Sequence, residues 1–545
     1  MTKDNLEQLA FVQLTDKQLS ALDKFTSLKS FRQGEKLFSA GDSDFKFFVI
    51  KKGKVEIVER STGKQKTVTV HEEKEFTGDI SMLTGRPSPV SAVAATDCEV
   101  YQVSNDDLKR ILKEIPQLGD CILQAFLTRR QLLESSEYAG LKVIGSKYAR
   151  DTLRLRDFLA KNKIPFTWID LESDRTVDEL LKQFEIAREE TPIVLLDNNS
   201  VLKNPENTEL AKVLGIRKTL EDIVYDLAII GAGPGGLAAA VYGASEGLKT
   251  IVLEKTAPGG QASCSSKIEN YMGFPLGLSG TDLANRALLQ AQKFGAQITS
   301  PAQVVGLESQ QGYKLIKLAS EEQVTARCVV IATGVKYKRL PVDRCEEFED
   351  CGVYYSATAV EAELCRDRVI IIVGGGNSAG QAAIFLSQYV EKVLLLIRGD
   401  SLSHSMSAYL SDRIEQSDMI QLLTHTEVTK MMGEDCLEAV EITNNQTQSK
   451  QEVKVAGVFI FVGAIPCTDW LPGDIATDEK GFIKTGMHLS NQDIPALNRQ
   501  PFLLETSQPG IFAAGDVRFD SIKRVASAVG EGSMTVKFVH QILSM

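Results

Sequence analysis

The sequence predicts a multidomain chain, with a β-barrel or jelly roll first, then a small α/β domain, then two doubly wound α/β domains. Three observations support this fold class. Short β-like runs separated by turns fill the amino-terminal part, and strand and helix patterns alternate between residues 140 and 218. Further on, two glycine-rich loops, Gly231–Gly236 and Gly374–Gly380, each follow an apolar run and lie about 140 residues apart. A chain of 545 residues is long enough for about three or four domains.

Composition and charge narrow the class of protein. With 43% hydrophobic and 24% charged residues, the chain has the composition of an ordinary globular protein. The net charge of −11 argues against nucleic acid as the main ligand. No run approaches the roughly 20 apolar residues that span a bilayer, and the first residues lack the apolar core of a signal peptide. We therefore expect a cytoplasmic protein without a membrane partner. Nine cysteines in a chain of this length do not suggest a disulfide scaffold, and most are expected to be buried thiols.

Residues 1–135 carry the pattern of a small β-barrel domain. A helical pattern from Leu19 to Leu28 opens it, and a longer helical stretch from Asn105 to Glu134 closes it. Between them, short strands with regular turns indicate a barrel or jelly roll. The β-like runs are Glu35 to Phe38, Phe45 to Lys51, Val55 to Val58 and Lys66 to Val70.

Residues 140–218 carry the pattern of a separate small α/β domain. The expected order of elements is β-α-β-α-β-β-α. The elements are a strand at Lys142–Gly145, a helix from Asp151 to Asn162, a strand from Phe166 to Leu171, a helix from Val177 to Phe184, a strand opened by proline at Thr191–Leu196 and, after a polar loop, a helix from Asn207.

The first glycine-rich loop has the context of a dinucleotide site. A strand at Asp226–Ile230 precedes it and a helix follows it. Gly231 permits the tight turn, Gly233 lets the backbone approach a pyrophosphate, and Gly236 lets helix and strand pack closely. The amino end of the helix offers free N–H groups to phosphates. Glu254 ends the next strand 23 positions after Gly231, where an acid accepts a ribose 2′-hydroxyl. The alternative is a structural turn with a surface glutamate.

The second glycine-rich loop follows the strand Arg368–Val373 and leads into a helix through Leu386. The next strand ends in Arg398, 24 positions after Gly374, where other dinucleotide sites carry an acid. An arginine there favours a 2′-phosphate and therefore NADPH, with NADH as the alternative. The other interpretation is that Arg398 is a solvated surface charge.

Four motifs occur in the order of a known family. They are Pro258–Gln261, Ile268–Pro275, Ile331–Gly334 and Gly510–Asp516. Over residues 223–545 the chain resembles the low-molecular-weight thioredoxin reductases. The resemblance implies two Rossmann-like domains that hold FAD and NAD(P), and it implies a homodimer. The NAD(P)-binding domain, residues 342–466, would be inserted between the FAD-binding parts 223–341 and 467–545.

The resemblance also implies residue roles. Gln261 and Asn270 would line the flavin, Asp516 would hold a ribityl hydroxyl, and Arg524 to Ala526 would bracket the isoalloxazine edge. Where the family usually has two adjacent arginines, this chain has Arg398-Gly399. The expected cofactor-binding residues are Gly231, Ala232, Gly233, Pro234, Gly235, Gly236, Glu254, Lys255, Gly260, Gln261, Asn270, Thr333, Gly334, Gly375, Gly376, Asn377, Ser378, Ala379, Arg398, Gly515, Asp516, Arg524, Val525 and Ala526.

The family's redox-active cysteine pair is missing, because no Cys-x-x-Cys occurs anywhere in the chain. In the family this pair lies between the two halves and relays electrons from flavin to thioredoxin. Ser356 and Ala359 stand at the two positions, and neither side chain stores two electrons as a dithiol. Cys351 and Cys365 flank the stretch without a short reactive spacing. Cys264, three residues after Gln261, is either close to the flavin ring or a buried inert thiol.

The two amino-terminal domains also resemble known modules with altered sites. Residues 140–218 resemble a thioredoxin or glutaredoxin fold, with Thr191-Pro192 as its cis-proline, but the expected active-site loop, Ser146–Ala149, has no cysteine. This domain would be a docking or spacer domain.

Phe76–Val90 resembles the phosphate-binding cassette of cyclic-nucleotide-binding domains, with Asp79 at the ribose-binding acid. The phosphate-binding arginine is expected near Ser88, but Arg86 comes two positions early and Pro89 removes an amide. Cyclic AMP is therefore not expected. A different nucleotide-like effector or anion, or a purely structural module, stays open.

These expectations lead to one functional hypothesis with alternatives. NAD(P)H would deliver hydride to FAD, and the flavin would pass electrons directly to a small molecule or a redox protein, without a disulfide. Hydride transfer to a flavin needs no acid or base from the protein, so no catalytic side chain is expected. The alternatives are a ferredoxin or flavodoxin NADP reductase, a thioredoxin-disulfide reductase, and a non-catalytic flavin or nucleotide sensor.

Overall fold

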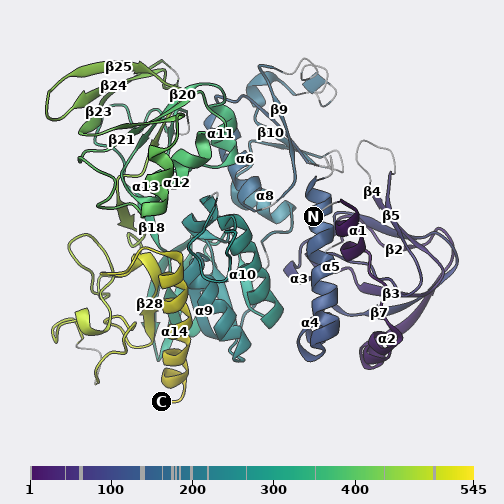
Figure 1. Ribbon diagram of the computed structural model, residues 1–545. Coiled ribbons are helices and arrows are strands. Elements are labelled where there is room, and N and C mark those ends of the chain that lie inside the picture. The colour runs from purple at the N-terminus through teal and green to yellow at the C-terminus, as the bar shows by residue number, and fades with distance from the viewer. Residues whose placement is uncertain are drawn as a thin grey trace. The chain divides into compact units, whose positions relative to one another are not determined.

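The computed structural model describes residues 3–42, 44–59, 66–135, 141–162, 164–173, 177, 181–182, 184, 186–196, 200–217, 220–265, 267–349, 351–434, 436–494 and 499–545. The chain divides into two units (Figure 1). One comprises Met1–Gly145, Asn162–Glu221 and Leu289–Pro301. The other comprises Ser146–Lys161, Asp222–Leu288 and Ala302–Met545. No helix in the described ranges has both the length and the apolar character needed to cross a bilayer.

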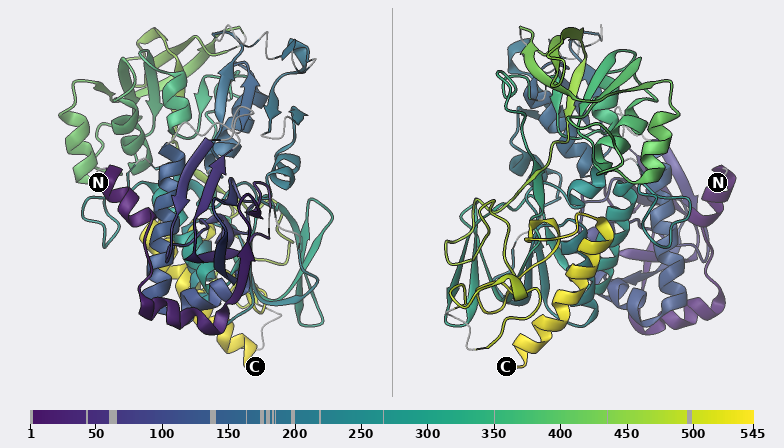
Figure 2. Two further views of the ribbon diagram at one scale, coloured as in Figure 1. Left: turned by 90° about the vertical axis from the view of Figure 1, so that its right-hand side faces the viewer. Right: turned by 60° about the vertical axis from the view of Figure 1, so that its left-hand side comes forward.

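The amino-terminal domain consists of two antiparallel sheets around an aromatic core, as the turn-rich pattern predicts. One sheet has the order β1-β7-β3 and the other β2-β6-β4-β5. The strands are β1 Ser27–Phe31, β2 Lys36–Phe38, β3 Phe47–Lys52, β4 Val55–Glu59, β5 Lys66–His71, β6 Ser91–Ala94 and β7 Cys98–Val103. The helices are α1 Lys3–Ala10, α2 Asp16–Leu22, α3 Ser81–Thr84, α4 Asn105–Glu114 and α5 Pro116–Ser135. Both views in Figure 2 show the long α5 (blue) beside the purple strands.

Two helical predictions in this domain are wrong in their bounds. The pattern from Leu19 to Leu28 is not one helix, because α2 ends at Leu22 and β1 begins at Ser27, after one turn of 3₁₀ helix. Leu28 is 51% exposed on β1, so it does not belong to the apolar stripe of the helix. The stretch from Asn105 to Glu134 is two helices. Pro116 cannot donate an N–H bond and disfavours helical backbone at the residue before it, and Ile115 has φ −125° and ψ 76°.

The middle segment contains a four-stranded sheet of order β11-β10-β8-β9. Strands β8 and β9 run parallel, while β10 pairs antiparallel with both β8 and β11. The elements are β8 Lys142–Gly145, β9 Thr167–Asp170, β10 Ile193–Leu195, β11 Val201–Lys203 and α8 Asn207–Val213. The Thr191–Pro192 peptide bond is cis, as expected. The predicted helix from Val177 to Phe184 lies mostly outside the described residues. The helix α6, Arg150–Lys161, belongs to the second unit.

The flavin-type half of the second unit has a central sheet in which β13-β12-β17-β16-β15 are neighbours and β28 pairs with β17. The strands β12, β13, β17 and β28 run parallel. The elements are β12 Val224–Ile230, α9 Pro234–Ser245, β13 Thr250–Leu253, β15 Val304–Gln310, β16 Tyr313–Leu318, β17 Gln323–Ile331, β28 Ile511–Ala513 and α14 Val525–Leu543. Helix α10, Gly280–Phe294, begins in this half, while its last residues and β14, Gln297–Thr299, belong to the first unit.

Helices α9 and α14 cross at close range (Figure 1). A Cβ on Gly532 of α14 would lie 2.0 Å from the carbonyl oxygen of Gly235 on α9. Only glycine permits this approach, so the carboxy-terminal helix is fixed against the helix that begins at the first glycine-rich loop.

The nicotinamide-type half is a parallel sheet of order β19-β26-β20-β21-β22. An antiparallel sheet of β23, β24 and β25 follows β22, and β18 pairs with β27 where the chain enters and leaves this half. The elements are β18 Val335–Tyr337, β19 Val353–Tyr354, α11 Ala359–Leu364, β20 Val369–Val373, α12 Asn377–Leu386, β21 Lys392–Leu396, α13 Ala408–Glu415, β22 Ile420–Leu423, β23 Thr426–Met432, β24 Ala439–Asn444, β25 Lys450–Lys454, β26 Gly457–Ile460 and β27 Ala464–Pro466.

Candidate functional site

The first glycine-rich loop turns sharply from β12 into α9. Gly231 has φ +103°, and a Cβ there would lie 2.4 Å from the carbonyl oxygen of Ala332. A Cβ on Gly236 would lie 1.9 Å from the carbonyl oxygen of Gly231. Both positions therefore require glycine, for the turn and for helix–strand packing respectively.

The amino end of α9 has free space beside its first backbone N–H groups, as a bound phosphate requires. Gly233 is the N-cap and Pro234 the first helical residue. A Cβ on Gly233 would meet only the Cα of Gly260, at 3.9 Å. The first backbone N–H groups of a helix have no partner within it, so this end presents amide donors beside free space. A dinucleotide pyrophosphate fits this cradle.

Glu254 fixes the loop from the end of β13. Its Oε2 accepts a hydrogen bond from the backbone N–H of Ala232 at 2.7 Å, and its Oε1 accepts one from Thr256 at 2.9 Å. Burial raises the pKa of Glu254, while hydrogen bonds from four backbone amides lower it, those of Ala232, Lys255, Thr256 and Ala257. Lys255 comes directly after Glu254.

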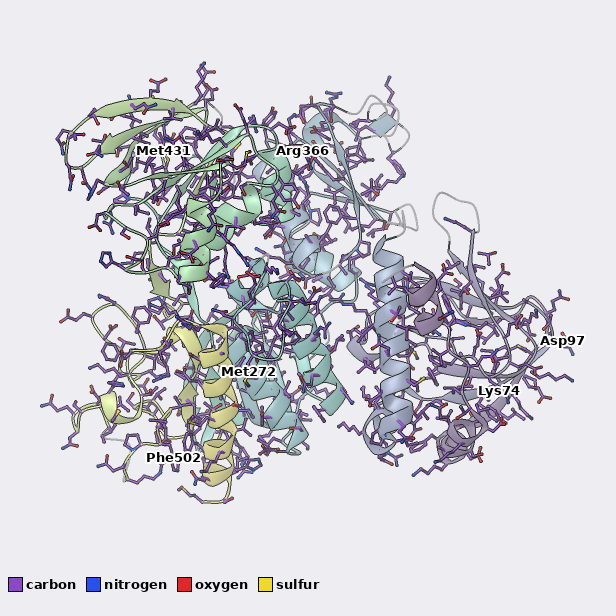
Figure 3. The ribbon with its side chains drawn as sticks, viewed as in Figure 1. Lys74, Asp97, Met272, Arg366, Met431 and Phe502 are labelled. Carbon is purple, nitrogen blue, oxygen red and sulfur yellow. A yellow bond between two sulfur atoms is a disulfide. The ribbon has the colours of Figure 1, made fainter. Side chains whose placement is uncertain are left out.

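The residues expected around the flavin ring come from separate loops. The Nε2 of Gln261 donates to the carbonyl oxygen of Val335 at 2.7 Å, which ties the loop of Gly260 to β18. The Oγ1 of Thr333 donates to Cys467 at 2.9 Å, next to Gly334 with φ +64°. Asn270 is exposed. Met272 in the same loop is 94% exposed (Figure 3).

The carboxy-terminal part adds Gly515, Asp516 and the start of α14. The N–H of Gly515 donates to Glu531 at 2.7 Å, and Arg518 pairs with the same carboxylate at 2.9 Å. Burial raises the pKa of Asp516 to about 6, against the opposing charge of Lys523. Arg524 is the N-cap of α14, and Val525 and Ala526 form its first turn.

The second glycine-rich loop has the same geometry as the first. Gly374 has φ +139°, and a Cβ there would lie 2.5 Å from the carbonyl oxygen of Phe461. Gly376 is the N-cap of α12, and a Cβ there would meet nothing within 4 Å. Gly375 accepts a hydrogen bond from the Oγ of Ser405 at 2.7 Å.

Side chains at the start of α12 and the end of β21 complete this loop. The Oδ1 of Asn377 accepts a bond from the N–H of Ser407 at 2.7 Å, and Ala379 is fully buried. Arg398 has an exposed side chain beyond the end of β21. Its carbonyl oxygen accepts a bond from Asn445 at 3.1 Å. The position of Arg398 suits a phosphate that approaches from solvent.

Three contacts join the nicotinamide-type loop to the flavin-type half. The hydroxyl of Tyr337 donates to the Oγ of Ser378 at 2.8 Å. Gln381 of α12 donates to the carbonyl oxygen of Lys267 at 3.3 Å, and Arg413 of α13 pairs with Glu269. The structure therefore brings the second loop to the flavin-type half. The sequence motifs gave no sign of Tyr337, Glu269 or Arg413 as contacts. The sequence feature that could have indicated the contact of Tyr337 is its position three residues after Gly334.

Comparison with known proteins agrees with this geometry. Residues 225–532 match the model of the pyridine nucleotide-disulphide oxidoreductase family. The chain belongs to that family. It is 32% identical over 320 residues to the thioredoxin reductase of Bacillus subtilis, which covers 58% of this chain and 95% of the relative. It is 31% identical over 315 residues to the 34.2 kDa protein in the rubredoxin operon of Clostridium pasteurianum, covering 58% and 96%.

A solved structure supports the same assignment. The thioredoxin reductase of Lactococcus lactis in its FR conformation has a TM-score of 0.53 at 29% identity, covering 59% of this chain and all of that chain. Residues 28–115 match the cyclic nucleotide-binding domain model. The chain is thus a thioredoxin reductase-like FAD- and NAD(P)-dependent oxidoreductase with an added cyclic nucleotide-binding domain, and the family implies FAD and NADPH.

The family's redox-pair positions form a hydrogen-bonded cap in this chain. The Oγ of Ser356 donates to Glu361 at 2.9 Å, and Thr358 caps α11 through the same carboxylate. Glu361 is buried and Ala359 is the first residue of α11. These groups satisfy each other and offer no thiol chemistry.

The two cysteines that flank this stretch are not joined to each other, as their spacing indicates. Cys351 forms a disulfide with Cys436, 85 residues away. Cys365 is a buried free thiol. Val353 and Ile371 lie level in the sheet, because both pair with Val458.

This register places the disulfide away from the nucleotide loop. Cys351 precedes Val353, towards the amino ends of the strands, while Gly374 lies at their carboxyl ends. The two positions differ by about 16 Å along the strand direction, at roughly 3.3 Å per residue. Cys264 is half-buried, and burial raises its pKa, which agrees with an inert thiol.

The nucleotide cassette of the amino-terminal domain packs against α5. A Cβ on Gly78 would lie 3.2 Å from the Cζ of Phe126 on α5. Arg129 of α5 donates to the carbonyl oxygen of Gly78 at 2.7 Å and stacks over Phe76 at 4.7 Å. Asp79 is buried and accepts bonds from Ser81.

The position of the expected phosphate-binding arginine does not offer a cation. Ser88 stands there, is buried, and donates to the carbonyl oxygen of Val90 at 2.8 Å. A serine without free space cannot replace a guanidinium as the partner of a cyclic phosphate. This position of the cassette therefore lacks the cation that would pair with a cyclic phosphate.

Proposed function

We propose that this oxidoreductase passes electrons from NAD(P)H through FAD directly to an acceptor that is not a disulfide. The observation that carries the proposal is the hydrogen bond between Tyr337 and Ser378, which holds the nicotinamide-type loop at the flavin-type half. At the same time, Ser356 and Ala359 replace the two thiols of a relay. A small molecule or a redox protein must therefore take the electrons from the flavin itself.

The residues present fit both cofactors. The cradle of Gly233 and Pro234 at α9 would hold the FAD pyrophosphate, and Glu254 its ribose. Gln261, Thr333 and Asp516 would face the flavin and its ribityl chain. The corresponding cradle at Gly376, with Asn377 and Ser378, would hold the nicotinamide dinucleotide. When bound, FAD supplies the redox chemistry by accepting hydride and releasing electrons.

The chain's own residues orient the two sites. The hydrogen bond between Tyr337 and Ser378 fixes the second glycine-rich loop at the flavin-type half. The ion pair between Glu269 and Arg413 joins the same two halves. Asp516, protonated below a pH of about 6, can donate a hydrogen bond at the ribityl position, and above that pH its carboxylate accepts one. No side chain is required as an acid or base in the hydride step.

NADPH is the proposed reductant because Arg398 would contact a 2′-phosphate. The side chain is exposed, so it is free to approach a phosphate from solvent. NADH is the alternative, since Gly399 follows where the family usually has a second arginine.

The disulfide Cys351–Cys436 is not proposed as a relay. It lies towards the opposite end of the nicotinamide-type sheet from the loop at Gly374. Thiol–disulfide exchange and flavin reduction of a disulfide both need direct contact of the reacting atoms. A thioredoxin-disulfide reductase activity is therefore not part of the proposal.

The roles of the other domains are proposed as structural or regulatory. In the amino-terminal domain, Phe126 and Arg129 of α5 hold Gly78 of the cassette in place. The thioredoxin-like identity of residues 140–218, the remaining domain boundaries and a cytoplasmic homodimer stay predictions.

An anaerobic titration tests the proposal. The purified yellow protein is mixed with NADPH and, separately, with NADH in a stopped-flow spectrophotometer. The flavin absorbance should bleach rapidly, and faster at low NADPH than at low NADH. Protein that binds no FAD, or whose flavin stays oxidised with both nucleotides, would contradict the proposal and favour a sensor. Turnover with a thioredoxin would contradict the non-disulfide acceptor.

A further inference from the structure

Helix α6 and the loop before it pack beside the positions of the missing cysteine pair. We define the relay surface as residues 354–365, which include the two former cysteine positions and all of α11. The segment Ser146–Lys161 belongs to the same unit as this surface. In Figure 1, α6 and α11 lie next to each other. The segment contacts the relay surface and the residues directly before it, at the two ends and in the middle of α6.

The middle of α6 contributes an apolar contact. Leu153 is 8% exposed and shares one buried cluster with Tyr354, Ala357 and Cys365. The buried side chains of α6 spread over more than half of the helix circumference, and they are Thr152, Leu153, Leu155, Arg156, Phe158 and Leu159. This arc is wider than the apolar stripe of a helix that packs on one side only.

The amino end contributes polar contacts. The Nη2 of Arg150 donates to the carbonyl oxygen of Glu346 at 3.3 Å and also to that of Glu347. The Sγ of Cys351 lies 3.6 Å from the carbonyl oxygen of Tyr148. Tyr148 stands in Ser146–Ala149, the loop where a thioredoxin-like domain would carry its own cysteines. This loop therefore meets the chain directly before the relay surface.

The carboxyl end contributes charge. Lys161 pairs with Asp157 at 2.7 Å. Burial lowers the pKa of Lys161, but Asp157, Cys264 and Glu361 together raise it overall. Glu361 is the buried carboxylate that holds Ser356. The ammonium group of Lys161 thus lies within electrostatic range of the former redox position.

We propose that the segment Ser146–Lys161 is a built-in occupant of the relay surface, which it closes to external protein partners. The occupant is the chain's own helix. Leu153 shares the buried cluster of the relay surface, and Arg150 and Tyr148 hold the segment at Glu346 and Cys351, directly before that surface. An external acceptor must then approach the flavin from another side. This inference deepens the proposed function by excluding one class of partner, the thioredoxin-like protein, on steric grounds.

A cysteine at the former redox position reports on this closure. In the full-length variant Ser356→Cys, a maleimide with a long polyethylene glycol chain should label position 356 slowly. A small methanethiosulfonate reagent should label it readily. The native chain has seven free cysteines, so labelling is read at the peptide that contains residue 356 by mass spectrometry.

Two substitutions should open the surface. Arg150→Ala removes the polar contact, and Leu153→Asp places a charge in the apolar one. Each, added to Ser356→Cys, should speed labelling by the large reagent about tenfold or more, with little change for the small one. Lys212→Asp, at an exposed side chain of α8, is the matched control and should change neither rate.

The outcomes separate this inference from the proposed function. The inference is wrong if the large reagent labels position 356 at the same rate in Ser356→Cys alone and in the variants that also carry Arg150→Ala or Leu153→Asp. Leu153→Asp can disturb folding, so amide hydrogen exchange of residues 354–365 is also measured in Arg150→Ala. Unchanged protection of these residues would likewise overturn the inference. Flavin bleaching by NADPH is measured in the same samples, and it should persist in every variant, since the proposed hydride step does not involve α6.

Discussion

The hydroxyl of Tyr337 lies 2.8 Å from the Oγ of Ser378 and donates a hydrogen bond to it. Tyr337 comes from β18, directly after the flavin-type loop of Gly334, and Ser378 from the first turn of α12. One bond thus connects the two dinucleotide loops, although the residues are 41 positions apart in the sequence. The ring of Tyr337 also meets Phe461 edge-on at 5.1 Å, which fixes the direction of the hydroxyl.

Removing that hydroxyl should slow flavin reduction. A neutral hydrogen bond contributes about 0.5–1.5 kcal/mol, so Tyr337→Phe should lower the rate of bleaching by NADPH about two- to tenfold. Stopped-flow measurement at saturating NADPH gives this rate. Tyr242→Phe is the control, because Tyr242 is 47% exposed on α9. An unchanged rate in Tyr337→Phe would show that the bond does not orient the loops.

Gly236 should tolerate no side chain. A Cβ would lie 1.9 Å from the carbonyl oxygen of Gly231, so the turn must open or α9 must shift. We expect Gly236→Ala to be purified largely without FAD, as measured by absorbance near the flavin maximum and by reconstitution. Gly530→Ala on α14 is the matched control, since a Cβ there meets nothing within 4 Å. Full flavin content in Gly236→Ala would contradict the assigned role of this loop.

Arg398 should determine the choice of nicotinamide cofactor. A charge-assisted bond to a phosphate is worth about 1.5–3 kcal/mol, so Arg398→Ala should raise the KM for NADPH by about tenfold or more. The KM for NADH should change little, because that cofactor has no 2′-phosphate. Steady-state reduction of an artificial acceptor measures both. Equal effects on the two cofactors would identify Arg398 as a surface charge only.

The sequence predicted the parts of this molecule whose geometry is set locally. The glycine-rich loops follow from steric demands at Gly231, Gly236 and Gly374, which any single strand–turn–helix unit imposes. The break at Pro116 is equally local, but the apolar pattern continues on both sides of it and so predicts one helix. In contrast, the contacts of Ser378, Glu269 and Arg413 depend on how two halves meet, and no short pattern records such a relationship.

The disulfide shows the same limit. Cys351 and Cys436 are separated by 85 residues, and only the fold of the β23–β24 hairpin against β19 brings them together. The sequence singled out Cys351 and Cys365 because both flank the former redox pair, and it indicated no disulfide partner for either. Cys365 is a buried free thiol. Spacing along the chain does not reveal the pairing of distant cysteines.

Breaking this disulfide should reduce stability without stopping flavin reduction. A disulfide typically contributes about 2–4 kcal/mol to the free energy of unfolding, with values towards the upper end for long loops. Cys351→Ser with Cys436→Ser should therefore unfold at lower urea than the unaltered chain, while the bleaching rate with NADPH stays within about twofold. Cys121→Ser, at a free half-buried thiol, is the control. Loss of flavin reduction in the double variant would reinstate the pair as an electron relay.

The pH dependence of stability should carry the signature of Asp516. Its pKa is raised from 3.8 to about 6 by burial, so the folded state binds a proton that the unfolded state has released between these values. The contribution of Asp516 to the free energy of unfolding is therefore fully present below pH 4 and is lost as the pH rises through about 6. At about 1.4 kcal/mol per pKa unit, the loss is at most about 3 kcal/mol. Asp516→Asn should lack this loss.

Urea unfolding of the FAD-free chain at pH 4.5 and pH 7 measures the difference. Other carboxylates titrate in the same range, so the informative quantity is the change between the two pH values in the unaltered chain minus that in Asp516→Asn. The free energy of unfolding should therefore fall more from pH 4.5 to pH 7 in the unaltered chain than in Asp516→Asn, because only the unaltered chain must ionise a buried carboxyl group.

Lys523, whose charge opposes the shift, supplies a second test. Lys523→Met removes a cation that favours the ionised carboxylate, so it should move the pKa of Asp516 further upward and extend the sensitive range above pH 6. If neither substitution alters the pH profile, Asp516 is hydrated in solution rather than held in a buried ribityl site.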